Sequence, residues 1–496
     1  MRIPDAAVQT IELSTVGLWS KVRHLGPALI VAFLATEFAL IPGNKARIVA
    51  GAAMVFLALL CWAFLDFGRW ILLFFASAIL LPPLPVSIGN SGPHVSLVFA
   101  AIGLLLGGMH LYQWKRWSGP LPLALTVFTA GLLCSLVFAA VLSGAEVAGA
   151  SFIRVLLFAI GPYVLFYTLW GPASQIRSNP VLTTRVLFYC AVAASAFACL
   201  DYYFQFPAPA GYGPQFVWLS DGVFRRAQGL FYEASTLGNF CAFFLVMIVI
   251  AMFRPNEERP LPAFVLLGGG TILTAALILS SSRASLLNLA VATCTVCFLR
   301  RTPPRRTFFV ILPSLLGAAI IVFYVFPSFA ENYWSRLHLS MKYIGASSGI
   351  LSGRVDSWRI LLDFLADHPW FTIFGIGYKT LPYSDYIGTE LIGDNTYLTL
   401  LAETGLVGLI SFLWLNAVIL RSGFRAARSA NAQTAFFGTW IFCFWIGEMV
   451  QMFSGDLITY WRVLPIYFWV LAVAIQGTDR RMGSFDRGRI RELSSA

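Results

Sequence analysis

Long apolar runs follow one another along almost the whole chain and constrain its fold more than any other feature. A helix needs about 20 mostly apolar residues to cross the hydrocarbon core of a bilayer, with shorter ones tolerated when tilted or re-entrant. We predict an all-α polytopic membrane protein with about 14 transmembrane helices, within a range of 12–14 because the third and tenth runs are short. The runs are 25–42, 48–66, 70–84, 95–112, 121–143, 151–170, 183–205, 234–253, 261–280, 284–299, 308–327, 395–420, 434–453 and 459–476.

Composition supports the membrane class. The 496 residues are 58% hydrophobic and only 11% charged, which is too little charge for a soluble protein of this length. The formal charge of +11 indicates basic loops at a membrane surface, with the lipid bilayer as partner and no nucleic acid. The first 24 residues lack the short apolar core of a cleaved signal peptide. A CxxC pair, Cys294 and Cys297, lies inside an apolar run and is interpreted as packing rather than metal binding.

The distribution of Lys and Arg predicts the orientation. Basic residues crowd into alternate short loops and the C-terminal tail: "QWKRWSG", "FRPNEERP", "LRRTPPRR", "LRSGFRAAR" and "DRRMGSFDRGRIRE". Cytoplasmic loops carry such an excess, so we expect both termini inside. The predicted organisation is a cytoplasmic segment 1–24, helices 1–11 over 25–327, a large outer loop 328–394, helices 12–14 over 395–476 and a basic cytoplasmic tail 477–496.

The large outer loop contains a predicted amphipathic helix, "SGRVDSWRILLDFLADHP". Ser352 is a candidate N-cap and Pro369 follows the last turn. This helix would lie on the bilayer surface, cover an outward cavity, or do both. Its expected apolar stripe is Val355, Trp358, Leu361, Leu362 and Leu365, with Asp356, Arg359, Asp363 and Asp367 opposite.

Ionisable residues inside apolar runs favour one side of the membrane. Such residues are costly in lipid and often functional. Under the predicted topology Glu403 lies deeper in the membrane, whereas Glu37, Arg154, Asp201, Arg283 and Glu448 fall in or near the outer halves of their spans. This one-sided distribution favours a polar cavity open to the outside. The alternative is a set of independent ion pairs that hold helices together.

Four arginines enter the same outer layer. Arg225 and Arg226 open the stretch "RRAQGLFYEASTLGNF", Arg283 lies in "SSSRAS" and Arg354 lies in "SGR". The fixed charge and forked donors of arginine suit phosphate or pyrophosphate. We therefore predict an anion site there, with contact to lipid headgroups as the alternative, above all for Arg225 and Arg226.

Three motifs in this order resemble the bacterial O-antigen ligase and polymerase superfamily (the Wzy/WaaL type). They are "RAQGLFYEAS", "LILSSSRASLLNLAV", and a third that begins with "SGRVDSW", continues through "DHPWFTIFGIGY" and closes with "GDNTYLTLLAETGLVGL". Together with the large outer loop they cover about residues 180 to 420.

The resemblance implies a GT-C-like glycosyltransferase that works at the outer face of the bacterial cytoplasmic membrane. Its donor would be a glycan carried on undecaprenyl pyrophosphate, and it would need no metal or other cofactor. By position, Arg226, Arg283 and Arg354 would bind the departing pyrophosphate. The expected partners are the lipid-linked donor and acceptor oligosaccharides, with a chain-length regulator as a further candidate.

Two departures from the ligase pattern favour a polymerase. The lipopolysaccharide ligases of the family typically carry His-Asn where this chain has Asp394 and Asn395, and "FYEAS" resembles the Glu-Pro-Ser of repeat-unit polymerases. The prediction is therefore a repeat-unit polymerase for O antigen, capsule or exopolysaccharide. The alternatives are an O-antigen ligase that transfers glycan to lipid A core or protein, and a lipid-linked oligosaccharide flippase.

Glycosyl transfer also needs a base for the acceptor hydroxyl. Glu233 is our first candidate and Asp394 the second. Glu233 would otherwise hold Arg225 or Arg226 in an ion pair, and Asp394 would otherwise cap the helix that starts at Asn395. His338 and His368 also lie in the outer loop, and His368 is interpreted as structural. Candidate contacts to glycan or acceptor are Arg154, Tyr232, Trp358, Asn395 and Tyr397.

Overall fold

The computed structural model describes ten stretches of the chain: 44–64, 68–84, 93–172, 179–206, 215–219, 222–231, 233–301, 304–327, 354–383 and 393–477. The chain divides into two compact units, Met1–Arg69 and Trp70–Ala496. In the first unit, α2 (Asn44–Phe64) is an apolar helix, and the guanidinium of Arg69 lies 4.9 Å from the centre of the Trp62 ring.

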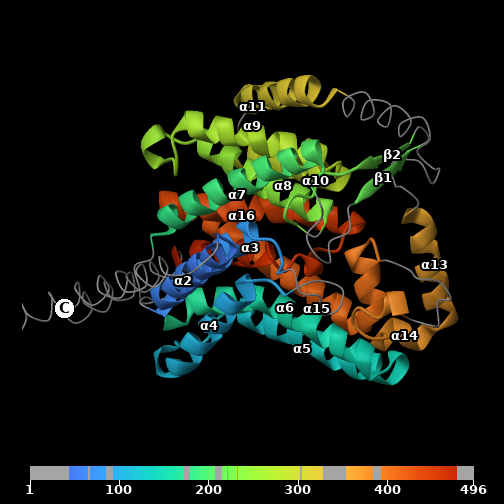
Figure 1. Ribbon diagram of the computed structural model, residues 1–496. Coiled ribbons are helices and arrows are strands. Elements are labelled where there is room, and N and C mark those ends of the chain that lie inside the picture. Colours follow the sequence, from blue (N-terminus) through green and yellow to red (C-terminus); the bar gives the residue numbers. More distant parts are fainter. Residues whose placement is uncertain are drawn as a thin grey trace, which may run out of the picture. The chain divides into compact units, whose positions relative to one another are not determined.

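The second unit consists mainly of apolar helices (Figure 1). In chain order they are α3 (Arg69–Leu80, whose first residue belongs to the other unit), α4 (Ser96–Met109), α5 (Pro120–Ser143), α6 (Ala145–Leu169), α7 (Pro180–Phe204), α8 (Ala234–Met252), α9 (Ala263–Leu279), α10 (Arg283–Arg300), α11 (Pro304–Val325), α13 (Arg354–Asp367), α14 (Pro369–Phe374), α15 (Thr396–Ala427), α16 (Ala432–Gln451) and a last helix, Leu464–Gly477.

These helices confirm the predicted polytopic membrane fold. Of the fourteen predicted spans, 25–42 lies outside the described residues, and a helix occupies each of the other thirteen. Seven helices in the described part of the chain are long and apolar enough to cross a membrane: α5, α6, α7, α8, α10, α15 and α16. The protein is therefore a multi-pass membrane protein.

Helix α8 lies at the centre of the second unit. It is apolar on all sides and buried along almost its whole length, as expected for a helix surrounded by others. It contacts α9, α10 and α16. The ring of Phe243 in α8 packs against Trp440 of α16 and Tyr467 of the last helix, with 4.4 Å between ring centres in each pair.

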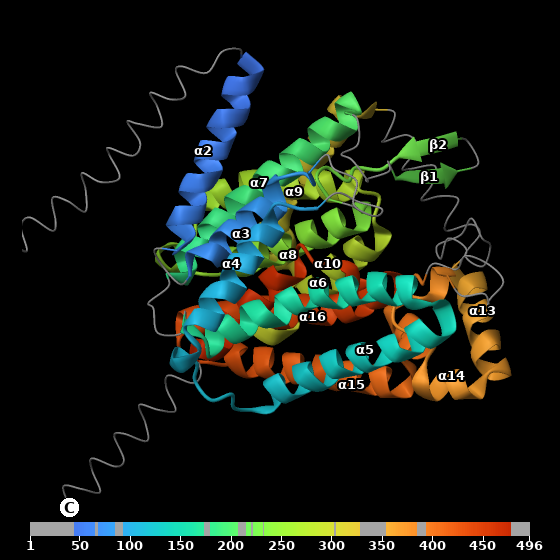
Figure 2. The ribbon, with the colours of Figure 1, turned by 60° about the horizontal axis from the view of Figure 1, so that its bottom comes forward.

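A β-hairpin, which the sequence patterns do not predict, precedes α8. Its strands β1 (Phe216–Leu219) and β2 (Gly222–Arg225) are antiparallel, with Phe216 opposite Arg225. Figures 1 and 2 both place this hairpin, α13 and α14 toward one end of the helices.

The predicted amphipathic helix is confirmed as α13, but its buried face differs from the predicted stripe. Leu361, Phe364 and Leu365 are buried against Ile376, Leu381 and Ala402, whereas Val355 and Leu362 are exposed. The stripe that includes Phe364 follows the 3-4 spacing of residues on one helical face. The candidate cap Ser352 lies outside the described residues.

Candidate functional site

Four helices begin in the region that contains the predicted arginines. Glu233 is the N-cap residue of α8, Arg283 is the first residue of α10, Arg354 is the first residue of α13 and Asn395 is the N-cap residue of α15. A helix N-terminus carries unpaired backbone N–H groups and a partial positive charge. Their position beside arginines therefore favours an anionic ligand.

Arg226 is held by the turn between α9 and α10. Its Nε donates to the carbonyl oxygen of Ser280 at 2.8 Å, and the next backbone amide, of Ala227, donates to Leu279 at 3.0 Å. The first two sequence motifs are separated along the chain by α8 and α9, and these two hydrogen bonds join them in space.

Arg226, Arg283 and Arg354 form what we call the arginine cluster. Burial lowers the pKa of Arg226, and the positive charges of Arg354 and Arg283 lower it further, whereas Tyr460 and Glu233 raise it. These four groups therefore lie near enough to Arg226 for their charges to act on it. The three arginines predicted by position to bind pyrophosphate are therefore brought together by the fold.

Arg225, although adjacent in sequence, has a different environment. Its guanidinium donates to both carboxylate oxygens of Asp201 at 3.1 and 3.3 Å and to the carbonyl oxygen of Phe206. Both side chains of this ion pair are largely buried. Arg225 joins the hairpin to the end of α7.

Glu233 lies beside the arginine cluster. Its Oε2 accepts a hydrogen bond of 2.8 Å from Ser235, and its charge acts on Arg226, Lys379 and Tyr460. The carboxylate therefore lies among three groups of the site, a position that fits either a base or a partner of Arg226.

Asp394 pairs with the arginine cluster and does not cap the helix. Its Oδ2 lies 3.5 Å from Nε of Arg354. The cap alternative is wrong, because the side chain of Asn395 accepts hydrogen bonds from the amides of Tyr397 (3.0 Å) and Leu398 (3.2 Å). Asn395 is 4% exposed, so the structure gives it a capping position rather than an open one for substrate.

The sequence patterns do not single out Lys379, a buried lysine in this region. Its Nζ pairs with Asp456, and its charge interacts with Glu403, Arg154 and Glu233. Burial lowers the pKa of Lys379, with Glu403 as the largest opposing influence. Arg154, a predicted substrate contact, donates to the carbonyl oxygen of Lys379 at 3.2 Å.

A glycine-rich loop presents Lys379. Gly375 and Gly377 have φ of 74° and 113°, and an added Cβ on Gly375 would lie 2.3 Å from the carbonyl oxygen of Glu403. Helix α15 is interrupted at Gly405, where φ is 69° and an added Cβ would meet the carbonyl oxygen of Ile373 at 2.1 Å. This close backbone contact requires glycine on both sides. The signal available in the sequence was the pattern "FGIGYK" followed by "ETG".

The remaining predicted contacts have ordinary structural environments. The hydroxyl of Tyr397 donates to Met449 at 2.9 Å, and the ring of His368 stacks near Phe364 and Phe371. Trp358 is half-buried on α13. Tyr232, Glu37 and His338 lie outside the described residues. No group of three His, Cys, Asp or Glu side chains suited to a metal occurs in the described stretches.

A buried polar network lies beneath the site. Glu448 of α16 accepts hydrogen bonds from the side-chain amides of Asn239 and Asn288. Gln451 accepts from the same two amides and donates to Ser285 at 3.2 Å. The network ties α8, α10 and α16 together one to two turns from the N-termini of α8 and α10, and so fixes where Glu233 and Arg283 lie.

Comparison with known proteins finds a similarity over part of the chain. Residues 263–413 match the family model described as O-antigen ligase (Wzy_C), a stretch that includes Arg283, Arg354, Lys379 and Asp394. No curated protein matches the chain. The match confirms the superfamily that the three motifs predict. The matched stretch, 151 of the 496 residues, supports a membrane glycan-processing enzyme of the O-antigen ligase and polymerase type.

Proposed function

We propose that this protein is a polysaccharide repeat-unit polymerase. It joins oligosaccharides carried on undecaprenyl pyrophosphate at the outer face of the bacterial cytoplasmic membrane, for O antigen, capsule or exopolysaccharide. The observation that carries this proposal is the arginine cluster, in which Arg226 lies among Arg283, Arg354 and Glu233.

The cluster suits the departure of a pyrophosphate. An acceptor hydroxyl attacks the anomeric carbon of the donor glycan, and a new glycosidic C–O bond forms. The bond between that carbon and the pyrophosphate oxygen breaks, and its electron pair remains on the lipid pyrophosphate. Preorganised cations stabilise this developing charge, and Arg226, Arg283 and Arg354 supply them.

Glu233 is the proposed base. It takes the proton that the acceptor hydroxyl loses, and it lies close enough to the arginine cluster for its charge to act on Arg226. Ser235 donates to one of its oxygens at 2.8 Å and orients the carboxylate. Asp394 is the second candidate, and it pairs with Arg354 of the same cluster at 3.5 Å.

The outward direction of the site is inferred from charge. Helices α8, α10 and α15 begin at the site, and at their far ends lie Arg254, Arg300, Arg301, Arg425 and Arg428. An excess of basic residues favours the cytoplasmic side. The arginine cluster then faces the periplasm, where lipid-linked glycans are used.

The second candidate is an O-antigen ligase, which the description of the matching family favours. Asp394 in place of the ligase histidine supports the polymerase instead. In both reactions the donor and leaving group are the same, and the acceptor distinguishes them.

The test supplies purified full-length protein with undecaprenyl-pyrophosphate-linked repeat units from its own source and separates the products on a gel. A ladder of increasing length is expected for a polymerase. A single transfer that appears only after lipid A core is added would identify a ligase instead. Glu233→Gln should abolish the ladder, while Glu146→Gln, on the exposed first turn of α6, should not.

A further inference from the structure

A second arginine-lined site lies at the other end of the helices that form the candidate active site. It is a cavity of about 340 Å³ between the residues that follow α8, the ends of α10 and α15 and the first turns of α16. Its lining is Phe253, Arg254, Pro255, Glu258, Leu299, Arg300, Ala427, Arg428, Ala435 and Thr439. The proposed reaction uses none of these residues.

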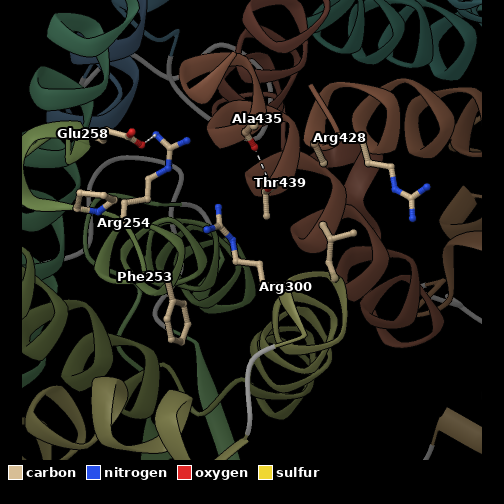
Figure 3. Close-up of a pocket in the computed structure, with 10 residues that line it drawn as sticks. Phe253, Arg254, Glu258, Arg300, Arg428, Ala435 and Thr439 are labelled. Atoms are coloured by element: carbon tan, nitrogen blue, oxygen red, sulfur yellow. Dashed lines mark hydrogen bonds and ion pairs between the residues drawn. The ribbon is translucent and has the colours of Figure 1, made fainter. Parts of the chain in front are cut away.

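Two of the arginines lie on one side of the cavity. Figure 3 shows the guanidinium group of Arg254 at Glu258 and that of Arg300 on the same side of the cavity, while Arg428 points away. Arg428 is exposed and lies over the ring of Phe424, at 4.6 Å. Arg254 and Arg300 are therefore the two cations of the cavity, and Arg428 belongs to its rim.

Glu258 and the partial negative charge at the C-terminal ends of α8, α10 and α15 balance part of the positive charge of the two arginines. Nη1 of Arg254 lies 3.7 Å from Glu258, a side chain that is 44% exposed, and Nη2 of Arg254 donates to the carbonyl oxygen of Ala432. In the part of the chain that the structure describes, the buried Nε of Arg300 has no hydrogen-bond partner. Burial lowers the pKa of Arg254, and the charge of Arg300 lowers it further. An anion between the two guanidinium groups would reduce the repulsion between them and would accept a hydrogen bond from Nε of Arg300.

The position and lining of the cavity point to an amphiphilic anion. Helix α8 has 19 residues and is about 28 Å long, so the cavity lies about one hydrocarbon thickness from the arginine cluster. This is the depth at which phospholipid phosphates lie. Phe253, Leu299 and two alanines supply apolar surface beside the arginines. Basic pockets between membrane helices commonly hold anionic headgroups.

We propose that this cavity binds a phosphate group, supplied by the headgroup of an anionic phospholipid in the leaflet opposite the candidate active site. The phosphate accepts hydrogen bonds from Arg254 and Arg300, and the acyl chains lie outside along the ends of the helices. This site is independent of the proposed polymerase reaction.

The test uses native mass spectrometry of the full-length protein in detergent, titrated with phosphatidylglycerol, phosphatidylcholine or inorganic phosphate. We expect phosphatidylglycerol to bind at least 10-fold more tightly than phosphatidylcholine. Arg300→Gln should weaken phosphatidylglycerol binding about 10-fold, because a charge-assisted hydrogen bond is lost. Arg421→Gln is the matched control, since Arg421 is exposed on α15 and does not line the cavity.

The three ligands distinguish a lipid headgroup from a soluble phosphate as the source of the bound group. The headgroup assignment would be overturned if inorganic phosphate bound, if this binding were lost in Arg300→Gln, and if the protein did not prefer either lipid. The ligand would then be a soluble phosphate. Equal binding of both lipids with no binding of phosphate would overturn the site altogether. So would an equal loss in the Arg300→Gln and Arg421→Gln variants. Arg300→Lys, which keeps the charge, shows whether a loss in Arg300→Gln reflects misfolding.

Discussion

Nε of Arg226 donates to the carbonyl oxygen of Ser280 at 2.8 Å, and this bond joins two regions that are 54 residues apart in sequence. Ser280 ends α9, and the turn after it leads directly to Arg283 at the start of α10. The bond therefore fixes one arginine of the cluster relative to the next. A flexible lysine could supply the same charge but not the same forked, directed geometry.

The first prediction concerns Arg226. Arg226→Gln should lower kcat about 100-fold, because removal of one preorganised group that stabilises developing negative charge has an effect of this size. Arg226→Lys should lower kcat about 10-fold, since lysine keeps the positive charge but loses the hydrogen bond to the carbonyl oxygen of Ser280. Rates of product formation with lipid-linked repeat units measure both.

Arg225→Gln is the control for Arg226, because the two residues are adjacent but differ in environment. Arg225 is paired with Asp201, and both are largely buried, so its loss should lower the thermal unfolding midpoint more than it lowers kcat. If Arg225→Gln instead abolished activity at an unchanged midpoint, the division of roles between the two arginines would be wrong.

The second prediction concerns Lys379. Lys379→Met should lower activity about 100-fold, because it removes a cation beside Glu233 and leaves Asp456 and the buried Glu403 without their lysine partner. Lys115→Met, which changes an exposed lysine, should leave activity unchanged.

A double-mutant cycle separates the pair from its surroundings. If Lys379 and Asp456 act as an ion pair, Lys379→Met combined with Asp456→Asn should lose less activity than the two single losses added together. Strict additivity would mean that the contact between them has no role in the reaction.

Most of the helices were predictable because their apolar runs are long enough to span a membrane, and the proximity of the three arginines was expected from the order of their motifs. The burial of Lys379 could not be predicted, because a lysine in a loop is ordinarily exposed. Its burial depends on the break in α15 at Gly405, which lets the loop approach the backbone of Glu403. The hairpin at 216–225 was missed for a related reason: its four-residue strands are too short for a period-2 pattern to stand out.

The third prediction concerns the start of α15. Asn395→Ala should lower the free energy of unfolding by about 1 kcal/mol, because the side chain caps the amides of Tyr397 and Leu398. Asp394→Asn should leave the unfolding midpoint almost unchanged, because Asp394 is half-exposed and its ion pair with Arg354 is 3.5 Å long. Thermal unfolding followed by tryptophan fluorescence compares the two. A larger loss in Asp394→Asn would show that Asp394 has a capping role after all.

The last prediction concerns His94, whose ring lies edge-on to that of Trp461 with 5.8 Å between ring centres. The amide of Ser96 donates to its Nδ1 at 3.2 Å, and its Nε2 lies 2.9 Å from the carbonyl oxygen of Leu81. Nδ1 must accept and Nε2 must donate, so the ring is neutral with its proton on Nε2. Burial, and then the charge of Arg462, lower the pKa of His94 from 6.5 to about 4.

The sign of the pH effect follows from this shift. Between pH 6.5 and about 4 the unfolded chain binds a proton that folded His94 does not, so the free energy of unfolding falls as the pH falls. The full difference corresponds to about 3 kcal/mol. We expect the unfolding midpoint of the wild type to fall between pH 7 and pH 4.5 more steeply than that of His94→Gln, which cannot be protonated. His368→Gln, at an exposed histidine, should follow the wild type. Parallel curves for the wild type and His94→Gln would mean that His94 is protonated in the folded protein without cost.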